Sequence, residues 1–330
     1  MRFCYFYLDG GRHFGLRTND GFLDLDVACR DYYAVRPVKN ADPNRFRDLR
    51  AFLAGGADSA TLASSILEYI ENRRKSGWTP RAATGERFYF RSTEKVAYLP
   101  PILPGAKILS LRSNHAAHAR ELGLETPKRP QAVARFTNTL SAHDQSLFLM
   151  APDQRPEVDL ELGVVMGATA RRIPREQALE HVAGFATVMS VGYRGLEYAE
   201  GGAAPDWVLG RGLDYSLSVG PGIMARDEVP DPKGRKMELK VNGVVRQAGS
   251  TDEYLFSAAE AIHQLSQGIT LEFGDLITLG SIPSAPGFEA GKPERTLRAG
   301  DVIEGTIEGI GTLKNTVVAE PAQGAPLRGN

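Results

Sequence analysis

The chain has 330 residues, of which 42% are hydrophobic and 24% charged, and its formal net charge at pH 7 is −1. This length suffices for one large domain or two of ordinary size. The interleaved charges exclude the basic stripe of a nucleic-acid-binding protein, and no apolar run approaches the roughly 20 residues of a membrane span. Two cysteines, Cys4 and Cys29, exclude a disulfide framework and a cysteine zinc site. Without an apolar signal sequence, we expect a cytoplasmic protein with no nucleic-acid or membrane partner.

The first 75 residues carry the signals of a small α+β unit. Short apolar runs in residues 1–25 are separated by Asp9-Gly10-Gly11 and Asn19-Asp20-Gly21, and such dipeptides favour hairpin turns. Residues 45–75 have apolar residues at helical spacing, split by Gly55-Gly56. We therefore expect a β-meander followed by helices.

A cluster of prolines indicates a domain boundary. Pro100, Pro101 and Pro104 lie close together, and prolines at this spacing make a chain stiff and extended. We expect a small N-terminal α+β domain at residues 1–98 and a larger domain at residues 99–330. The segment "AKILSL" after the prolines predicts a short buried strand, and the polar residues 124–157 predict a long functional loop.

The rest of the chain is predicted to be rich in strands. Apolar runs typical of strands occur in "VDLELGVVMG", "MELKVNGVVRQ", "DLITLGSI" and "DVIEGTIEGIG", and Asn242-Gly243 predicts a hairpin turn. One helix is expected at residues 251–268, with Thr251 as its N-cap and Gly268 at its C-terminal end. Strands and helices do not alternate regularly, which indicates an α+β class and not a doubly wound sheet.

The segment "SNHAAHARELG" places His115, His118 and Glu121 three residues apart. With Ser113 or Asn114 as its cap, a helix would carry all three along one side. Three alternatives are open: a solvent-facing helix, a zinc site (for which the usual spacing is i and i+4), and a general base oriented by a carboxylate. In the third alternative Glu121 accepts the imidazole N–H of a histidine that activates water.

The segment "EVDLELGVVMG" places Glu157, Asp159 and Glu161 on one face of a predicted strand, with apolar residues opposite. Carboxylates this close repel one another unless solvent or a cation separates them. Oxygen ligands of this kind suit Mg²⁺, Mn²⁺ or Ca²⁺. The alternatives are a cation site and an exposed acidic edge of a sheet.

These two motifs, in this order, resemble those of the fumarylacetoacetate hydrolase family. "SLRSNHAAHARE" is similar to the family stretch "GLNYADHAAE", and "EVDLELGVVMG" is similar to "DYEGELAVVIG". The later segments "LSQGITLEFGDLITLG" and "LRAGDVIEGTIEGIGTLKNTV" also resemble the family. The resemblance covers about residues 100–318.

The resemblance implies the β-roll catalytic domain of this family, a smaller N-terminal domain and a homodimer. It implies an enzyme acting on 2-oxo or 2,4-dioxo acids by C–C bond hydrolysis, decarboxylation, dehydration or tautomerisation. In the family Mg²⁺ or Mn²⁺ binds the oxygens of a small carbonyl acid and stabilises an enolate. No organic cofactor is implied.

Carried over residue by residue, the resemblance makes His118 the catalytic base and Glu121 its orienting carboxylate. The metal ligands fall on Asp159 and Glu161, and the third ligand, an aspartate in the family, falls on Ser190 in "GFATVMSVGYRGL". A hydroxyl in place of a carboxylate removes one charge from the site. A bound Mg²⁺ or Mn²⁺ ion and a cation-free site are therefore both open.

Three arginines are candidates for substrate binding or catalysis. Arg194 matches a family arginine, whereas Arg135 and Arg211 replace family lysines. A guanidinium is a planar fork suited to carboxylates. The three are predicted to clamp a carboxylate or an enolate and to do part of the cation's work. For Arg135 a surface ion pair is the alternative.

Four further residues are predicted to contact the substrate. Ser281 lies in "LGSIPSAPGF", a loop that lines the pocket in the family, and Gln247 lies in "LKVNGVVRQAGST". Ser190 and Tyr193 differ from the smaller or more polar family residues and indicate a reshaped, more apolar pocket.

Three functional hypotheses follow. The leading one is an enzyme that hydrolyses a C–C bond in a 1,3-dicarbonyl or 2-oxo acid, with Arg194 and Arg211 holding the oxyanion. The second is a lyase, decarboxylase or tautomerase of a 2-oxo acid that needs no cation. The third is a catalytically silent relative that binds a small acid.

Overall fold

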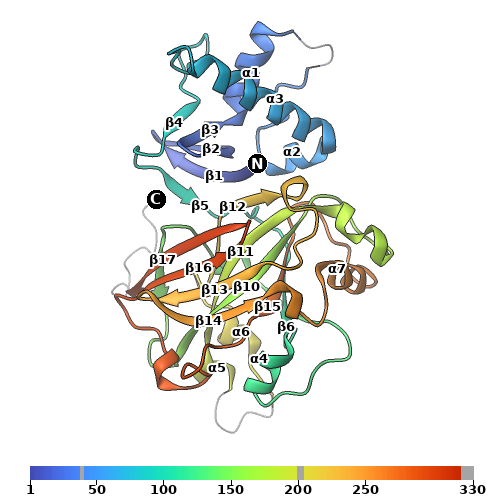
Figure 1. Cartoon of the computed structure of the whole chain (residues 1–330), viewed down its shortest axis with the longest axis vertical. Coiled ribbons are helices and arrows are strands. Elements are labelled where there is room, and N and C mark those ends of the chain that lie inside the picture. The colour runs from blue at the N-terminus through green and yellow to red at the C-terminus, as the bar shows by residue number, and fades with distance from the viewer. Residues whose placement is uncertain (38–40, 199–203, 321–330) are drawn as a thin grey trace.

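The computed structural model describes residues 1–37, 41–198 and 204–320. Figure 1 shows three helices together at one end of the molecule: α1 (Leu25–Val35), α2 (Leu49–Ala54) and α3 (Gly56–Arg74). Three short helices lie at the opposite end: α4 (Ala116–Glu121), α5 (Arg194–Glu197) and α6 (Trp207–Arg211). Over the described ranges, no helix is both long and apolar enough to cross a membrane.

Most strands belong to two sheets. The twelve-stranded sheet has the main order β4 (Tyr89–Arg91), β3 (Gly21–Asp24), β2 (Gly11–Arg17), β1 (Arg2–Leu8), β12 (Leu217–Ala225), β11 (Val182–Tyr193), β10 (Pro156–Met166), β15 (Leu276–Ser281), β6 (Ile108–Arg112) and β7 (Gln131–Arg135). Two short strands join it, β5 (Ala97–Leu99) beside β1 and β8 (Leu140–Ala142) beside β12. The five-stranded sheet has the order β14 (Val244–Ser250), β13 (Lys236–Val241), β16 (Val302–Ile307), β17 (Gly311–Ala319) and β9 (Ser146–Leu149). The predicted β-rich α+β class is confirmed.

The predicted N-terminal elements are present. Strands β1, β2 and β3 form the expected antiparallel meander, and Asp9 and Gly10 take positive φ at its first turn. Gly55 separates α2 from α3. The sequence did not indicate α1, whose N-cap Asp24 accepts a hydrogen bond from the Val27 N–H.

The N-terminal meander belongs to the same sheet as strands from the later part of the chain. Strand β1 pairs antiparallel with β12, and Arg2 lies opposite Met224 in this pairing. The apolar cluster behind these strands combines Phe3 of β1 with Val188 of β11 and Leu217 of β12. The division of the chain into residues 1–98 and 99–330 stays a prediction.

Two local predictions are wrong. Residues 124–157 are not an irregular loop, because β7, β8 and β9 form there by pairing with strands distant in sequence. The helix expected from Thr251 is α7 (Ala258–Ser266), which begins where Ser257 and Glu260 form a reciprocal capping box. Thr251 starts a separate 3₁₀ turn.

Strand β10 has two chemically different faces. Val158, Leu160 and Leu162 enter the core that β10 shares with the five-stranded sheet. Gly305 of β16 permits this close packing, since a Cβ atom there would lie 2.8 Å from Leu160 Cδ1. The opposite face of β10 carries the row of carboxylates. The packing of the two sheets therefore fixes where these acidic side chains point.

Leu160→Ala should lower the free energy of unfolding by about 2–5 kcal/mol, because it opens a cavity between two packed sheets. Leu160 is fully buried, whereas Leu209 is 49% exposed. Leu209→Ala is the matched control and should change stability by less than about 0.5 kcal/mol. Urea unfolding followed by circular dichroism measures both, and equal effects would contradict the packing described.

Candidate active site

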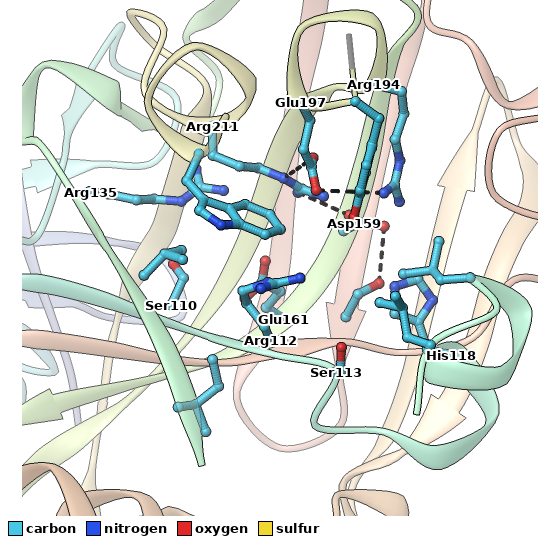
Figure 2. Close-up of a pocket in the computed structure, with 17 residues that line it drawn as sticks. Ser110, Arg112, Ser113, His118, Arg135, Asp159, Glu161, Arg194, Glu197 and Arg211 are labelled. Atoms are coloured by element: carbon cyan, nitrogen blue, oxygen red, sulfur yellow. Dashed lines mark hydrogen bonds and ion pairs between the residues drawn. The ribbon is translucent and has the colours of Figure 1, made fainter. Parts of the chain in front are cut away.

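A cavity of about 60 Å³ lies among α4, α5, α6 and the strands β6, β7, β10 and β15. Figure 2 shows Arg135 and His118 on opposite sides of it, with Glu161 between them. Its lining includes Ser110, Arg112, Ser113, His118, Arg135, Asp159, Glu161, Arg194, Glu197, Tyr198, Trp207, Arg211 and Ser281. Segments distant in sequence therefore meet around one small polar space.

The predicted helix of the first motif is α4, and its two histidines have different surroundings. His115 is the extended N-cap residue and makes no capping hydrogen bond, and its Nε2 lies 3.4 Å from Glu253 Oε2. Asn114 does not cap the helix but exchanges hydrogen bonds with the backbone of Phe256. Of the two histidines, only His118 lines the cavity. The solvent-facing alternative is wrong, since both side chains are buried.

His118 and Glu121 form the predicted pair. His118 Nδ1 lies 3.2 Å from Glu121 Oε2, one helical turn away. Glu121 Oε2 also accepts from the Ser284 N–H at 3.1 Å, and Oε1 accepts from Ser284 Oγ at 2.5 Å and from the Ala290 N–H. The carboxylate is thus anchored to the segment that follows β15, and it fixes the imidazole ring.

The environment of Glu121 keeps it ionised. Burial raises the pKa of this carboxyl, but the hydrogen bonds from His118, Ser284 and Ala290 outweigh burial and lower the pKa to about 2. At neutral pH the carboxylate only accepts hydrogen bonds. The proton of a neutral His118 therefore lies on Nδ1, and Nε2 is the acceptor nitrogen.

The carboxylates of β10 are buried, so the exposed-edge alternative is wrong. Glu157, Asp159 and Glu161 are 1–4% exposed. Buried charges require partners, because desolvation of an unpaired carboxylate is very costly. Each of the three has a different set of partners.

Asp159 is held between two guanidinium groups. Its Oδ1 accepts from Arg295 Nη2 at 2.5 Å, and its Oδ2 accepts from Arg211 Nη1 at 3.2 Å. Ser281 Oγ and Gln247 Nε2 also donate to Oδ1, at 3.0 and 3.3 Å. Burial opposes ionisation, but Arg295 and Arg211 hold the pKa of Asp159 far below its usual value.

Arg194 and Arg211 each form an ion pair with a buried carboxylate. Arg194 Nε donates to Glu157 Oε2 at 3.3 Å, and Arg211 Nε donates to Glu197 Oε2 at 2.9 Å. Burial alone lowers the pKa of Arg211, but Glu197 and Asp159 raise it above its ordinary value. Both arginines are therefore permanent, positioned cations.

Glu161 has a different environment from its neighbours. Its Oε2 accepts from Thr278 Oγ1 at 2.5 Å and from the Gly280 N–H at 3.2 Å. No arginine or lysine in the described chain forms an ion pair with it. Neutral donors fix this carboxylate at the wall of the cavity.

Arg135 is buried and not a surface ion pair, so that alternative is wrong. It is 6% exposed, and its Nη2 donates to Ser190 Oγ at 2.6 Å. Its Nε and Nη1 have no hydrogen-bond partner within the described residues. Burial, followed by repulsion from Arg211, lowers the pKa of Arg135 to about 10. The donors of this guanidinium remain available to an anion in the cavity.

The other residues predicted to contact substrate lie at different depths. Ser281 lines the cavity, whereas Ser190 and Gln247 are buried behind it and hold Arg135 and Asp159. Tyr193 lies away from the lining, since its hydroxyl accepts from the Met150 N–H at 3.1 Å. The structure thus brings Ser281, but not Tyr193, to the cavity.

The sequence did not indicate Arg295 or Arg112. Arg295 is 4% exposed and contacts Asp159 and also Glu121, with Nη1 3.6 Å from Glu121 Oε1. Arg112 lines the cavity, and its guanidinium stacks 3.5 Å from the centroid of the Trp207 ring. Their sequence contexts, "GKPERTLRAG" and "LSLRSN", carry no charge pattern that would distinguish them from surface arginines.

The sequence profile described as fumarylacetoacetate (FAA) hydrolase C-terminal matches residues 107–318. The chain belongs to the fumarylacetoacetate hydrolase family. Two relatives named oxaloacetate tautomerase are each 30% identical to it: mitochondrial FAHD2A of Bos taurus, covering 82% of this chain and 83% of the relative, and YisK of Bacillus subtilis, covering 84% and 94%.

Solved structures share the fold of this fumarylacetoacetate hydrolase family member. Fumarylpyruvate hydrolase of Pseudomonas aeruginosa, in complex with Mn²⁺ and pyruvate, has a TM-score of 0.59 and 26% identity, covering 69% of this chain and 94% of that one. The family-type fold predicted from the sequence is confirmed. The chain is an enzyme, as the family's hydrolases and tautomerases are, and the catalytically silent alternative is set aside.

The residues predicted to hold Mg²⁺ or Mn²⁺ do not fit a divalent cation in this chain. Both oxygens of Asp159 accept from guanidinium groups, and Ser190, at the third ligand position, accepts from Arg135. A cation would have to displace arginines from Asp159, and Ser190 would contribute no charge in return. In the part of the chain that the structure describes, no group of three or more His, Cys, Asp or Glu is arranged to hold a metal, which also sets aside the zinc alternative for α4.

Glu121 predicts a specific acid sensitivity. Because its folded-state pKa of about 2 lies below its ordinary value of 4.5, it stabilises the fold above about pH 4.5 and loses this contribution as the pH falls toward 2. Glu121→Gln lacks this contribution, so its unfolding free energy should fall less than that of the wild type between about pH 5 and pH 3. Urea unfolding at both pH values tests this.

The exposed Glu180 supplies the control for this comparison. Glu180→Gln should follow the wild type across the same pH range. If Glu121→Gln also follows the wild type, the contribution assigned to Glu121 is contradicted.

Proposed function

We propose that this enzyme catalyses keto–enol tautomerisation of a small 2-oxo acid. His118 transfers a proton at the carbon next to the keto group, and the guanidinium groups of the cavity hold the carboxylate and the enolate oxygen. The observation that carries the proposal is the oriented imidazole of His118 at the wall of an arginine-lined cavity.

The His118–Glu121 pair supports the role of a general base. An ionised Glu121 keeps the proton of His118 on Nδ1, so that Nε2 has a free lone pair. When Nε2 takes a proton from the substrate carbon, the C–H electron pair forms the C=C bond and the π pair of the carbonyl moves to the keto oxygen, which gives an enolate. The negative charge of Glu121 stabilises the imidazolium that forms. Water then protonates the enolate oxygen to give the enol, and the imidazolium of His118 returns its proton to the resulting hydroxide, which restores the neutral base.

The arginines support stabilisation of the enolate. Among the residues that the structure describes, Arg135 has two donors without partners and Arg194 has one, Nη2. Donors that are fixed before the reaction need no reorganisation when charge develops on the keto oxygen. In a small, mostly buried space their attraction for an anion is much stronger than in water.

The relatives favour a short substrate. Oxaloacetate, the substrate named for two relatives at 30% identity, is a 2-oxo acid of this kind and is our first candidate.

C–C bond hydrolysis of a 2,4-dioxo acid is the second candidate. The likeness to a fumarylpyruvate hydrolase favours it, and the same imidazole could take a proton from water instead of from carbon. Product analysis separates the two reactions, because hydrolysis yields two shorter acids and tautomerisation yields none.

His118→Ala should lower kcat for oxaloacetate tautomerisation by at least about 100-fold, as expected for loss of a general base. The enol absorbance, followed against the uncatalysed rate, measures turnover. His263→Ala is the matched control, since His263 lies on α7 and bonds to the Ile173 carbonyl outside the cavity. Retention of wild-type turnover by His118→Ala would contradict the role of His118.

A further inference from the structure

Two of the three positions predicted to bind a divalent cation, Asp159 and Ser190, contact guanidinium groups. Arg211 and Arg295 each take one oxygen of Asp159, at 3.2 and 2.5 Å. Ser190 Oγ accepts from Arg135 Nη2 at 2.6 Å and lies 3.5 Å from Arg211 Nη1. Positive charge is therefore already present where a cation would bring it.

The charge of the lining opposes an additional cation. The described residues that line the cavity include four arginines, Arg112, Arg135, Arg194 and Arg211, and three carboxylates. With His118 neutral, these lining groups carry a net charge of +1. A divalent ion would add two positive charges beside guanidinium groups that already occupy the oxygens of Asp159, and like charges repel one another.

The hydrogen-bond donors that lack partners in the described part of the site favour the binding of an anion. Arg135 has Nε and Nη1 without partners, and Arg194 has Nη2 without a partner, among the described residues. Buried donors without acceptors are costly, and a carboxylate or enolate oxygen would satisfy them. Arg135 is the strongest case, because its one hydrogen-bond partner among the described residues is a neutral hydroxyl.

We propose that guanidinium groups replace the divalent cation in this protein, so that Arg135, with Arg211 and Arg194, binds the vicinal oxygens of a 2-oxo acid directly. Ser190 holds Arg135 and Asp159 holds Arg211 in place of ligating a metal. The ligand class is a small planar dianion or enolate with two adjacent oxygens. The proposal deepens the proposed function and rests on it only for the identity of the substrate.

Arg295 also contacts Asp159, from a position outside the lining of the cavity. It pairs with Asp159 and lies 3.6 Å from both Glu157 Oε2 and Glu121 Oε1. Asp159 thus stays neutralised whether or not Arg211 shifts toward a bound anion. This allows Arg211 to share its donors between Asp159 and the ligand.

The first test combines elemental analysis with binding of oxalate, a planar dianion that resembles an enolate of pyruvate. Protein as purified, without added metal, should contain far less than one equivalent of Mg, Mn or Zn, and should bind oxalate equally well before and after stripping with EDTA. One bound equivalent of metal, or an approximately tenfold loss of oxalate affinity after stripping, would overturn the proposal.

The second test uses Arg135. Arg135→Leu should weaken oxalate binding at least about tenfold, whereas Arg30→Leu, on the outer face of α1, should not change it. Isothermal titration measures both, and circular dichroism confirms that each variant is folded. Arg135→Lys keeps the charge and serves if the leucine variant does not fold; wild-type oxalate affinity in a folded Arg135 variant would overturn the role of Arg135.

Two outcomes separate this inference from the proposed function. If no tautomerisation is found in the wild type but oxalate still binds without metal, only the proposed function fails. If tautomerisation is found but needs added Mn²⁺ or Mg²⁺, only the replacement of the cation fails.

Discussion

The site depends on the carboxylate of Asp159, which is buried between two arginines that reach it from different parts of the chain. Arg211 comes from α6 and Arg295 from the 3₁₀ turn Pro293–Arg295 after β15. Removing one partner of a buried ion pair costs about 3–5 kcal/mol, because the other charge is left without compensation. The pair of contacts therefore fixes α6 and the turn against β10, and α6 contributes Trp207 and Arg211 to the lining of the cavity.

The same network connects the His118–Glu121 pair to the arginines. Arg295 contacts Asp159 and lies within 3.6 Å of Glu121, whose carboxylate contacts His118. Ser284 strengthens this link, since its hydroxyl accepts from Arg295 and donates to Glu121. His118 and the guanidinium groups are consequently connected by one set of side-chain contacts, and positioned groups of this kind are what the proposed proton transfer next to a carbonyl requires.

The proposed guanidinium site makes other demands on the protein than a cation site does. A divalent ion needs several oxygen ligands close together, whereas arginines need separate carboxylates to hold each of them. Here Glu157 holds Arg194, Glu197 holds Arg211 and Asp159 holds both Arg211 and Arg295. Glu157 and Asp159 of β10 thus serve to position arginines in this structure.

Much of the fold was predictable, because local signals act over a few residues. The turn at Asn242-Gly243 and the alternation in β10 were identified correctly. The strands β7 to β9 were not predicted, because they are stabilised by pairing with strands outside the segment, β6, β12 and β17. Thr251 was a plausible cap by residue type, yet Ser257 with Glu260 makes the stronger reciprocal one.

The sequence by itself determined the family, the pair His118–Glu121 and the common face of Glu157, Asp159 and Glu161, since helix and strand periodicity decide which neighbours meet. It also placed Ser190 at the third ligand position. Only the tertiary structure decided what these groups contact: that Arg135 reaches Ser190, that Arg295 enters the site, and that Tyr193 does not. Charge pairing between buried groups depends on three-dimensional proximity, and no local sequence pattern predicts it.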